Sequence, residues 1–202
     1  MARRTSNISD APLLDWGEQL RAQRQKRRTL GRRTAIIGIG IALLGLTMAF
    51  PPAPRLVWNA SASAPVGLYL VTPGARPDPG DMVIARLPDP WRLMAARRHY
   101  LPANVPLVKR VAAAAGDEVC ARGSHVFVNG KWVANRRAAD ANGRSLPWWS
   151  GCKRLRGHQL FLLMPGSSAS FDGRYFGITE GALVIGTARL LWFKPIQGSD
   201  GA

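Results

Sequence analysis

The sequence is poor in the residues on which metal sites and the commonest hydrolytic triads depend. Its 202 residues include three histidines, His99, His125 and His158, and two cysteines, Cys120 and Cys152. No spacing of His, Cys, Asp or Glu suggests a metal site, no glycine-rich phosphate loop follows a predicted strand, and nothing marks a Ser-His-Asp arrangement. We therefore expect no metal and no cofactor, and lysine is left as the candidate base.

Acidic residues are also scarce. Twelve Asp and Glu stand against 28 Lys and Arg, which gives a net charge of +16. Such an excess would ordinarily suggest binding to nucleic acid or to an anionic membrane. The charge is uneven, however, because residues 1–33 hold nine basic residues against three acidic ones, and a dense basic cluster directly precedes an apolar run. That position indicates the orientation of a membrane anchor, so nucleic-acid binding is not expected.

Long hydrophobic runs are limited to residues 34–50, TAIIGIGIALLGLTMAF, which contain no charge and no proline. Its 17 residues are at the short end of what crosses a bilayer as a helix. A buried soluble helix is disfavoured because every face is apolar, and a cleaved signal peptide because its basic region would span residues 1–33. We predict a basic cytoplasmic tail at 1–33, a transmembrane anchor at 34–50 and an external domain at 51–202.

Both cysteines fall in the predicted external domain. An even pair in an oxidising compartment is consistent with a disulfide, which the chain-entropy model values at roughly 3 to 4 kcal/mol. Two free buried thiols are the alternative, because sequence does not show whether Cys120 and Cys152 approach each other.

Short apolar runs separated by turns predict that the external domain is mainly β. Asn129-Gly130, between alternating apolar residues, indicates a hairpin turn. One short helix is expected at 89–101, with Asp89 as its N-cap and Pro90 at its first position. The expected strands lie within residues 66–71, 81–87, 107–114, 125–133, 160–164 and 182–193.

Two aromatic stretches, Trp148-Trp149 and 190-LLWFKP-195, have the composition of residues that lie at a membrane interface. For Trp192 and Phe193 we favour core packing instead. The two interpretations predict different exposure of these rings.

Lys109 lies inside an apolar strand, 105-VPLVKRVAAAAGDEV-119. Strand alternation places it on the same face as Leu107 and Val111. An unperturbed lysine has a pKa near 10.4 and is almost wholly charged at neutral pH, whereas burial lowers that pKa and frees the amine to act as a base. The alternative is a lysine whose stem packs while its ammonium reaches water.

The stretch 59-NASASAPVGLY-69 has three interpretations. Ala60, Ser61 and Ala62 form an A-x-A signal peptidase cleavage site, and Asn59, Ala60 and Ser61 form a glycosylation sequon. In the third interpretation Ser63 is itself a nucleophile.

The residues around both candidates resemble the type I signal peptidase family, which uses a Ser-Lys dyad on a β-rich fold, and within it the conjugal-transfer peptidase TraF branch. The S-x-P-x-G-L-Y motif is similar to residues 63–69, and a K-R-V strand leading to G-D is similar to 109–111 and 116–117. A third box, S-F-D-S-R-Y-F-G, is similar to residues 170–177 and departs only at Gly173. The resemblance covers roughly residues 35 to 193.

The resemblance implies that Ser63 is the nucleophile and Lys109 its general base. It implies that the Ser61 hydroxyl helps to form an oxyanion hole with the backbone N–H of Ser63, a type of donor worth about 3 to 4 kcal/mol.

Supporting roles are implied for three residues of the third box. Ser170 matches a serine that orients the lysine amine, and Asp172 matches a carboxylate that acts through Arg174 or the lysine surroundings. Turn residues and a surface ion pair are the alternative interpretations. Gly173 in place of serine, and the absence of the wider family's G-D-N-R-D run, put this supporting shell in question.

The expected protein is therefore a mainly β, signal-peptidase-like domain behind one anchor, in the bacterial inner membrane with its catalytic domain in the periplasm. The resemblance implies a serine endopeptidase that processes a pilin-like precursor for conjugative transfer by type IV secretion, with release by water or by cyclisation. General signal peptidase I activity and a non-catalytic assembly factor of the secretion channel are the alternatives. A soluble self-cleaving Ser-Lys repressor is disfavoured by the anchor.

Overall fold

The computed structural model describes residues 11–50 and 53–193. The chain divides into two compact units, Met1–Pro52 and Ala53–Ala202. The first is helical and the second is built mainly from β-strands.

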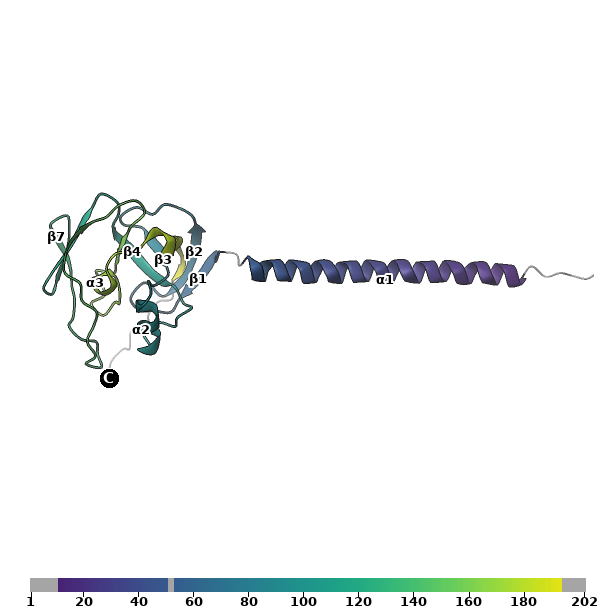
Figure 1. Ribbon diagram of the computed structural model, residues 1–202, viewed down its shortest axis with the longest axis horizontal. Coiled ribbons are helices and arrows are strands. Elements are labelled where there is room, and N and C mark those ends of the chain that lie inside the picture. Colours follow the sequence, from purple (N-terminus) through teal and green to yellow (C-terminus); the bar gives the residue numbers. More distant parts are fainter. Residues whose placement is uncertain (1–10, 51–52, 194–202) are drawn as a thin grey trace, which may run out of the picture. The chain divides into compact units, whose positions relative to one another are not determined.

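Among its described residues, the N-terminal unit forms one uninterrupted helix, α1 (Ala11–Ala49), as Figure 1 shows. The basic cluster and the apolar run are thus consecutive parts of one helix, of which Gln23–Ala49 is long and apolar enough to cross a membrane or to serve as a signal sequence. Its apolar side chains, among them Ile36, Leu44 and Met48, are exposed. The described residues of its own unit do not cover these side chains.

The larger sheet of the C-terminal unit has six antiparallel strands in the order β1-β2-β10-β3-β4-β9. Its central strands are close to the predicted runs, because alternating or continuous apolar residues fit a sheet that is covered by other elements. The strands are β1 (Leu56–Asn59), β2 (Gly67–Pro73), β3 (Met82–Ala85), β4 (Leu107–Ala113), β9 (Phe161–Leu163) and β10 (Val184–Phe193).

The smaller sheet has four antiparallel strands in the order β7-β6-β5-β8. The predicted hairpin turn joins β6 to β7, and its residues Asn129 and Gly130 have φ values of 48° and 75°. Both lie in the left-handed region that a two-residue I′ turn requires. The strands are β5 (Glu118–Arg122), β6 (His125–Val128), β7 (Lys131–Asn135) and β8 (Gly151–Arg154).

Three short helical segments accompany the sheets: α2 (Trp91–Arg97), α3 (Gly173–Phe176) and a 3-10 turn, η1 (Gly181–Leu183). The helix expected at 89–101 is α2, but the predicted Asp89 cap is wrong. Pro90 occupies the N-cap without a side-chain hydrogen bond, because the Asp89 carboxylate instead accepts a hydrogen bond from Arg92 Nε at 3.0 Å.

The apolar core links the two sheets. Val119 and Val126 of the smaller sheet pack in one cluster with Phe161 and Leu163 of β9. A second cluster, containing Tyr69 and Val108, lies within the larger sheet. The first cluster therefore joins the smaller sheet to β9 of the larger one, whereas the second belongs to the larger sheet alone.

Cys120 and Cys152 form a disulfide between adjacent strands β5 and β8. The prediction that they pair, rather than remain as free thiols, is confirmed.

The preference for core packing of Trp192 and Phe193 is wrong. The two residues are 53% and 50% exposed, because they occupy the end of β10, where its ring-bearing side chains extend past the buried part of the sheet. Trp192 stacks on Trp58 of β1 with ring centroids 5.6 Å apart. Residues 194 and 195 of the same stretch lie outside the described residues.

Candidate active site

Ser63 lies on a short loop that connects two paired strands. The loop, residues 60–66, runs from the end of β1 to the start of β2, where Asn59 and Gly67 are opposite each other in the ladder. Ala64 is 5% exposed and packs into the core beneath the loop. The Ser63 side chain is left half-buried beside it.

Asn59 holds this loop from below. Its Nδ2 donates to the carbonyl oxygens of Ser61 at 3.0 Å, Ala64 at 3.2 Å and Pro65 at 3.0 Å, and its Oδ1 accepts from Ser61 N at 3.1 Å. The side chain is 6% exposed, so these contacts compete little with water. Sequence reasoning missed this role, since Asn59 entered it only as part of a sequon; its place at a strand end before the loop was the available signal.

Gly67 and Tyr69 close the other side of the loop. Tyr69 Oη donates to the Pro65 carbonyl at 2.8 Å. A Cβ on Gly67 would lie 2.0 Å from the Trp192 carbonyl oxygen, so glycine is needed where β10 crosses the start of β2. These contacts explain why a glycine and a tyrosine stand at positions 67 and 69.

Lys109 lies on β4, between β3 and β9, and its Nζ is directed at the loop. The residue is 3% exposed, so its ammonium does not reach bulk water. Nζ donates to Ser63 Oγ at 2.8 Å and to Ser170 Oγ at 2.8 Å. Burial lowers the pKa of Lys109 to about 8, against an opposing effect of the Asp172 carboxylate and a further lowering by Arg174. A neutral amine at this distance can take the proton of the Ser63 hydroxyl.

Ser61 lies on the exposed side of Ser63. The two hydroxyl oxygens are 3.0 Å apart, and Ser63 N donates to Ser61 Oγ at 3.4 Å. The Ser61 hydroxyl and the Ser63 N–H therefore lie together, and both could donate to one oxygen atom of a bound peptide after the Ser61 hydroxyl turns outward.

Asp172 and Arg174 form a buried ion pair at the start of α3. Both residues are at most 1% exposed. Arg174 Nε donates to Asp172 Oδ1 at 2.8 Å and Nη2 to Oδ2 at 2.8 Å, while Asp172 Oδ1 also accepts from Arg174 N at 3.2 Å. This is a bidentate pair in the core, not the surface pair that was the alternative interpretation.

The pair also holds the loop that carries Ser170. Arg174 Nη2 donates to the carbonyls of Met164 at 2.9 Å and Ser167 at 2.8 Å, and Ser170 N donates to Ser167 O at 3.2 Å. Ser170 is 1% exposed. Its hydroxyl is thus fixed against Lys109 by a chain of contacts that begins at the ion pair.

Gly173, where the motif has serine, has no space for a side chain. A Cβ there would lie 2.7 Å from the Leu162 carbonyl oxygen and 2.7 Å from Phe161 Cε2. The Gly173 carbonyl accepts from Trp149 Nε1 at 3.1 Å. The departure from the motif therefore accompanies tight packing of α3 on β9, and the ion pair beside it is intact.

One group of potential metal ligands gathers among the described residues: Glu118, Cys120 and Cys152. Its two sulfur atoms are bonded to each other, which removes the thiolates that a metal would need. The group lies on the smaller sheet, and neither member of the Ser63–Lys109 pair belongs to it.

The unit is mainly β, and in it a serine hydroxyl lies against a buried lysine amine. Comparison with known families shows to which family a chain with this fold and site belongs. A profile of the signal peptidase family, peptidase S26, matches residues 28–193. The chain therefore belongs to that family.

The chain is also similar to curated relatives from conjugative systems. It is 33% identical over 168 residues to the plasmid transfer protein TraF of Escherichia coli, covering 77% of this chain and 93% of the relative. It is 33% identical over 172 residues to a probable conjugal transfer protein TraF of Sinorhizobium fredii, covering 77% and 90%. A solved signal peptidase I from Enterococcus faecalis has 18% identity and a TM-score of 0.33, covering 56% of this chain and 97% of that one.

Proposed function

We propose that the protein is a membrane-anchored serine endopeptidase in which Ser63 is the nucleophile and Lys109 the general base. The observation that carries this proposal is the 2.8 Å contact from Lys109 Nζ to Ser63 Oγ, made by a lysine whose pKa is lowered by burial to about 8. At pH 7 to 8 a useful fraction of the amine is neutral, whereas an ordinary lysine is almost entirely charged.

In the first step the neutral Lys109 amine takes the proton from Ser63 Oγ, which attacks the carbonyl carbon of the scissile peptide bond. The resulting oxyanion accepts hydrogen bonds from the Ser63 N–H and the Ser61 hydroxyl. The Lys109 ammonium returns the proton to the leaving amine as the peptide C–N bond breaks. The acyl group is then an ester on Ser63.

In the second step Lys109 takes a proton from the nucleophile that attacks the ester. With water the product is a carboxylic acid and free Ser63. With the amine of the same polypeptide the product is a new peptide bond and a cyclic chain. In either route the ester C–O bond breaks and the Lys109 ammonium returns its proton to Ser63 Oγ, which restores the hydroxyl without a cofactor.

Ser170, Asp172 and Arg174 act as positioning residues in this proposal. Ser170 Oγ lies 2.8 Å from Lys109 Nζ and limits the rotation of the amine. The buried ion pair sets the loop of Ser170 and balances the charge near Lys109, since Asp172 raises and Arg174 lowers the pKa of that lysine. The lysine thereby keeps a pKa suited to a base near neutral pH.

We assign α1 as a retained anchor, with the basic segment cytoplasmic and the catalytic unit in the periplasm of a bacterial cell. The exposed apolar side chains of β1 and of the end of β10 support a site near the membrane. Phe193 is opposite Gly67, at the end of the nucleophile loop. These exposed side chains are those of Leu56, Trp58, Leu190, Leu191, Trp192 and Phe193.

The substrate we propose is a pilin-like precursor of a conjugative, type IV secretion apparatus. The names of the relatives, plasmid transfer and conjugal transfer proteins, support a role in conjugation. A precursor anchored in the same membrane would be held near the membrane surface, where the nucleophile loop can reach it.

The test is incubation of the purified full chain with a candidate precursor, beside the Ser63→Ala variant and beside an exported precursor with an ordinary signal peptide. We expect cleavage of the pilin-like precursor by the wild type only. Mass spectrometry then distinguishes the two routes, because a cyclic product is lighter than the hydrolysed one by one water. Equal cleavage by the Ser63→Ala variant would contradict the proposed dyad, and preference for the exported precursor would indicate general signal peptidase activity.

A further inference from the structure

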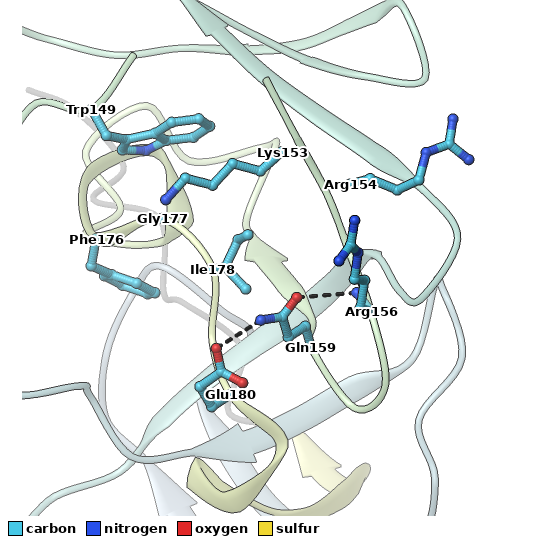
Figure 2. A pocket seen from close by; sticks show the side chains of 9 residues that line it. All are labelled: Trp149, Lys153, Arg154, Arg156, Gln159, Phe176, Gly177, Ile178 and Glu180. Carbon is cyan, nitrogen blue, oxygen red and sulfur yellow. Dashed lines mark hydrogen bonds between the residues drawn. The ribbon is translucent and has the colours of Figure 1, made fainter. Parts of the chain in front are cut away.

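A cavity lies beside strand β8 of the smaller sheet, away from the Ser63–Lys109 pair. Its volume is about 550 Å³, and neither Ser63 nor Lys109 lines it. Figure 2 shows its side chains, which come from β8 and the segments on either side of it, and from the end of α3 and the segment that follows. Trp149, Phe176 and Ile178 supply an apolar floor, which is the usual composition of a ligand site.

The register of the sheet shows why a lysine borders the core here. Lys153 of β8 pairs with Val119 of β5, and residues directly opposite in a ladder share a face. Val119 is fully buried in the core, so Lys153 stands on the core-facing side at the edge of the sheet. Lys153 lines the cavity, and Figure 2 shows its amine directed toward Gly177.

The strand that carries Lys153 is also an open edge. β8 is the last strand of its sheet, and no other described strand pairs with its outer side. All four of its residues are exposed. An exposed edge offers backbone N–H and C=O groups in the pattern that an extended peptide can pair with.

The rim of the cavity is mostly cationic. Lys153, Arg154 and Arg156 line it with one carboxylate, Glu180. Glu180 Oε1 is engaged by Gln159 Nε2 at 2.9 Å, and Arg154 Nη1 donates to Gly116 O at 3.2 Å. Among the described residues, the side chains of Lys153 and Arg156 make no hydrogen bond or ion pair. Their charges remain available to a ligand of opposite sign.

We propose that β8 and this cavity form a second peptide-binding site, which takes an extended acidic segment of a partner protein. The segment pairs with the outer edge of β8, places one apolar side chain over Trp149 and Ile178, and sets carboxylates against Lys153 and Arg156. Edge lysines oppose pairing with neutral or basic strands, so the same residues that attract an acidic strand exclude others. A lipid headgroup would satisfy the charges but would leave the strand edge unused.

The test is fluorescence-anisotropy binding to the full chain in neutral detergent. The probes are a labelled short peptide that alternates glutamate and valine around a central phenylalanine, and its lysine-for-glutamate counterpart. The variants are Lys153→Glu, which reverses the charge, and Ile178→Trp, which fills the cavity without changing charge. The matched control is Lys131→Glu, an exposed lysine on β7 at the other edge of the same sheet. Each is also made in the Ser63→Ala background.

We expect the acidic probe to bind with and without Ser63, and the affinity to fall by about tenfold or more in Lys153→Glu and in Ile178→Trp. Lys131→Glu should bind as the wild type does. The proposal is overturned by absence of binding, by equal binding of the two probes, or by equal loss in Lys131→Glu. Binding of short-chain phosphatidylglycerol that depends on Lys153, with no binding of the peptide, would reassign the cavity to a lipid. Loss of binding only in Ser63→Ala would place the peptide at the dyad, so each result is separable from a failure of the proposed protease activity.

Discussion

Two lysines of this protein face the core from β-strands, and their surroundings give them opposite chemistry. Lys109 is on β4, covered on both sides by β3 and β9, and is 3% exposed. Lys153 is on the edge strand β8 and is exposed to solvent. Both interrupt an apolar face, but only Lys109 is enclosed by neighbouring strands.

Enclosure changes the acid–base chemistry of the amine. Burial lowers the pKa of Lys109 to about 8, and two serine hydroxyls lie at 2.8 Å from its Nζ. Lys153 is exposed, and its side chain makes no hydrogen bond or ion pair with another described residue. The position of a lysine within a sheet, more than its strand pattern, thus decides whether it is suited to act as a base or as a cation.

The largest expected difference between the two lysines is in activity. Lys109→Arg should lower kcat/KM for precursor cleavage by about a thousandfold or more, because a guanidinium stays protonated and cannot act as a general base. Lys153→Arg keeps the charge at the edge strand and should leave kcat/KM unchanged. Comparable losses in the two variants would break the distinction between base and cation.

A similar contrast between buried and exposed charges is expected for two ion pairs. Asp172→Asn should lower the free energy of unfolding by about 3 to 5 kcal/mol, since it leaves the Arg174 charge buried without its partner. Asp89→Asn removes an exposed pair, with Arg92, and should cost less than about 1 kcal/mol. Urea unfolding monitored by circular dichroism measures both. A small effect at Asp172 would show that its pair does not hold the loop of Ser170.

The buried lysine should also make stability depend on pH. The folded state releases the Lys109 proton near pH 8, whereas the unfolded chain keeps it to about 10.5. Between these values the unfolded state binds more protons, so the free energy of unfolding rises with pH, by roughly 3 kcal/mol over the window. Urea titrations at pH values of about 7.5 and above, on both sides of the shifted pKa, measure the slope of the free energy of unfolding against pH. Lys109→Met should lose this slope, while Lys153→Met should keep the slope of the wild type.

The smallest effect concerns the glycine of the third box. Gly173→Ser restores the family residue but places a Cβ 2.7 Å from the Leu162 carbonyl oxygen, so we expect a loss of about 1 to 3 kcal/mol. A Cβ on Gly166 meets no atom within 4 Å, and Gly166→Ser should change stability by less than about 0.5 kcal/mol. Thermal unfolding measures both, and a neutral Gly173→Ser would show that α3 can shift away from β9.

The sequence predicted the features that local patterns encode. Alternation around Lys109 marked a charged residue on an apolar face, and Asn129-Gly130 marked the hairpin turn because few residue pairs adopt two left-handed conformations. The Ser63 motif was recognisable because its serine, proline and glycine lie within one short loop. Each of these signals is contained within a few consecutive residues.

Features that depend on distant contacts were not predictable in the same way. Asn59 stabilises the nucleophile loop through backbone carbonyls whose positions exist only in the folded loop. The exposure of Trp192 follows from where β10 ends relative to β1 and β2. The cavity at Lys153 depends on its register with Val119, which the sequence of β8 alone does not specify.

The most direct test of the central claim is the pH dependence of kcat/KM for a peptide that spans the cleavage site of a pilin-like precursor. This profile reports the ionisation of the free enzyme's base. If Lys109 is the buried base of Ser63, kcat/KM rises with pH to a plateau with a midpoint at about 8, and Lys153→Met has the same profile. A midpoint near 10.5, the ordinary value for lysine, or a profile without an inflection in this range would contradict it.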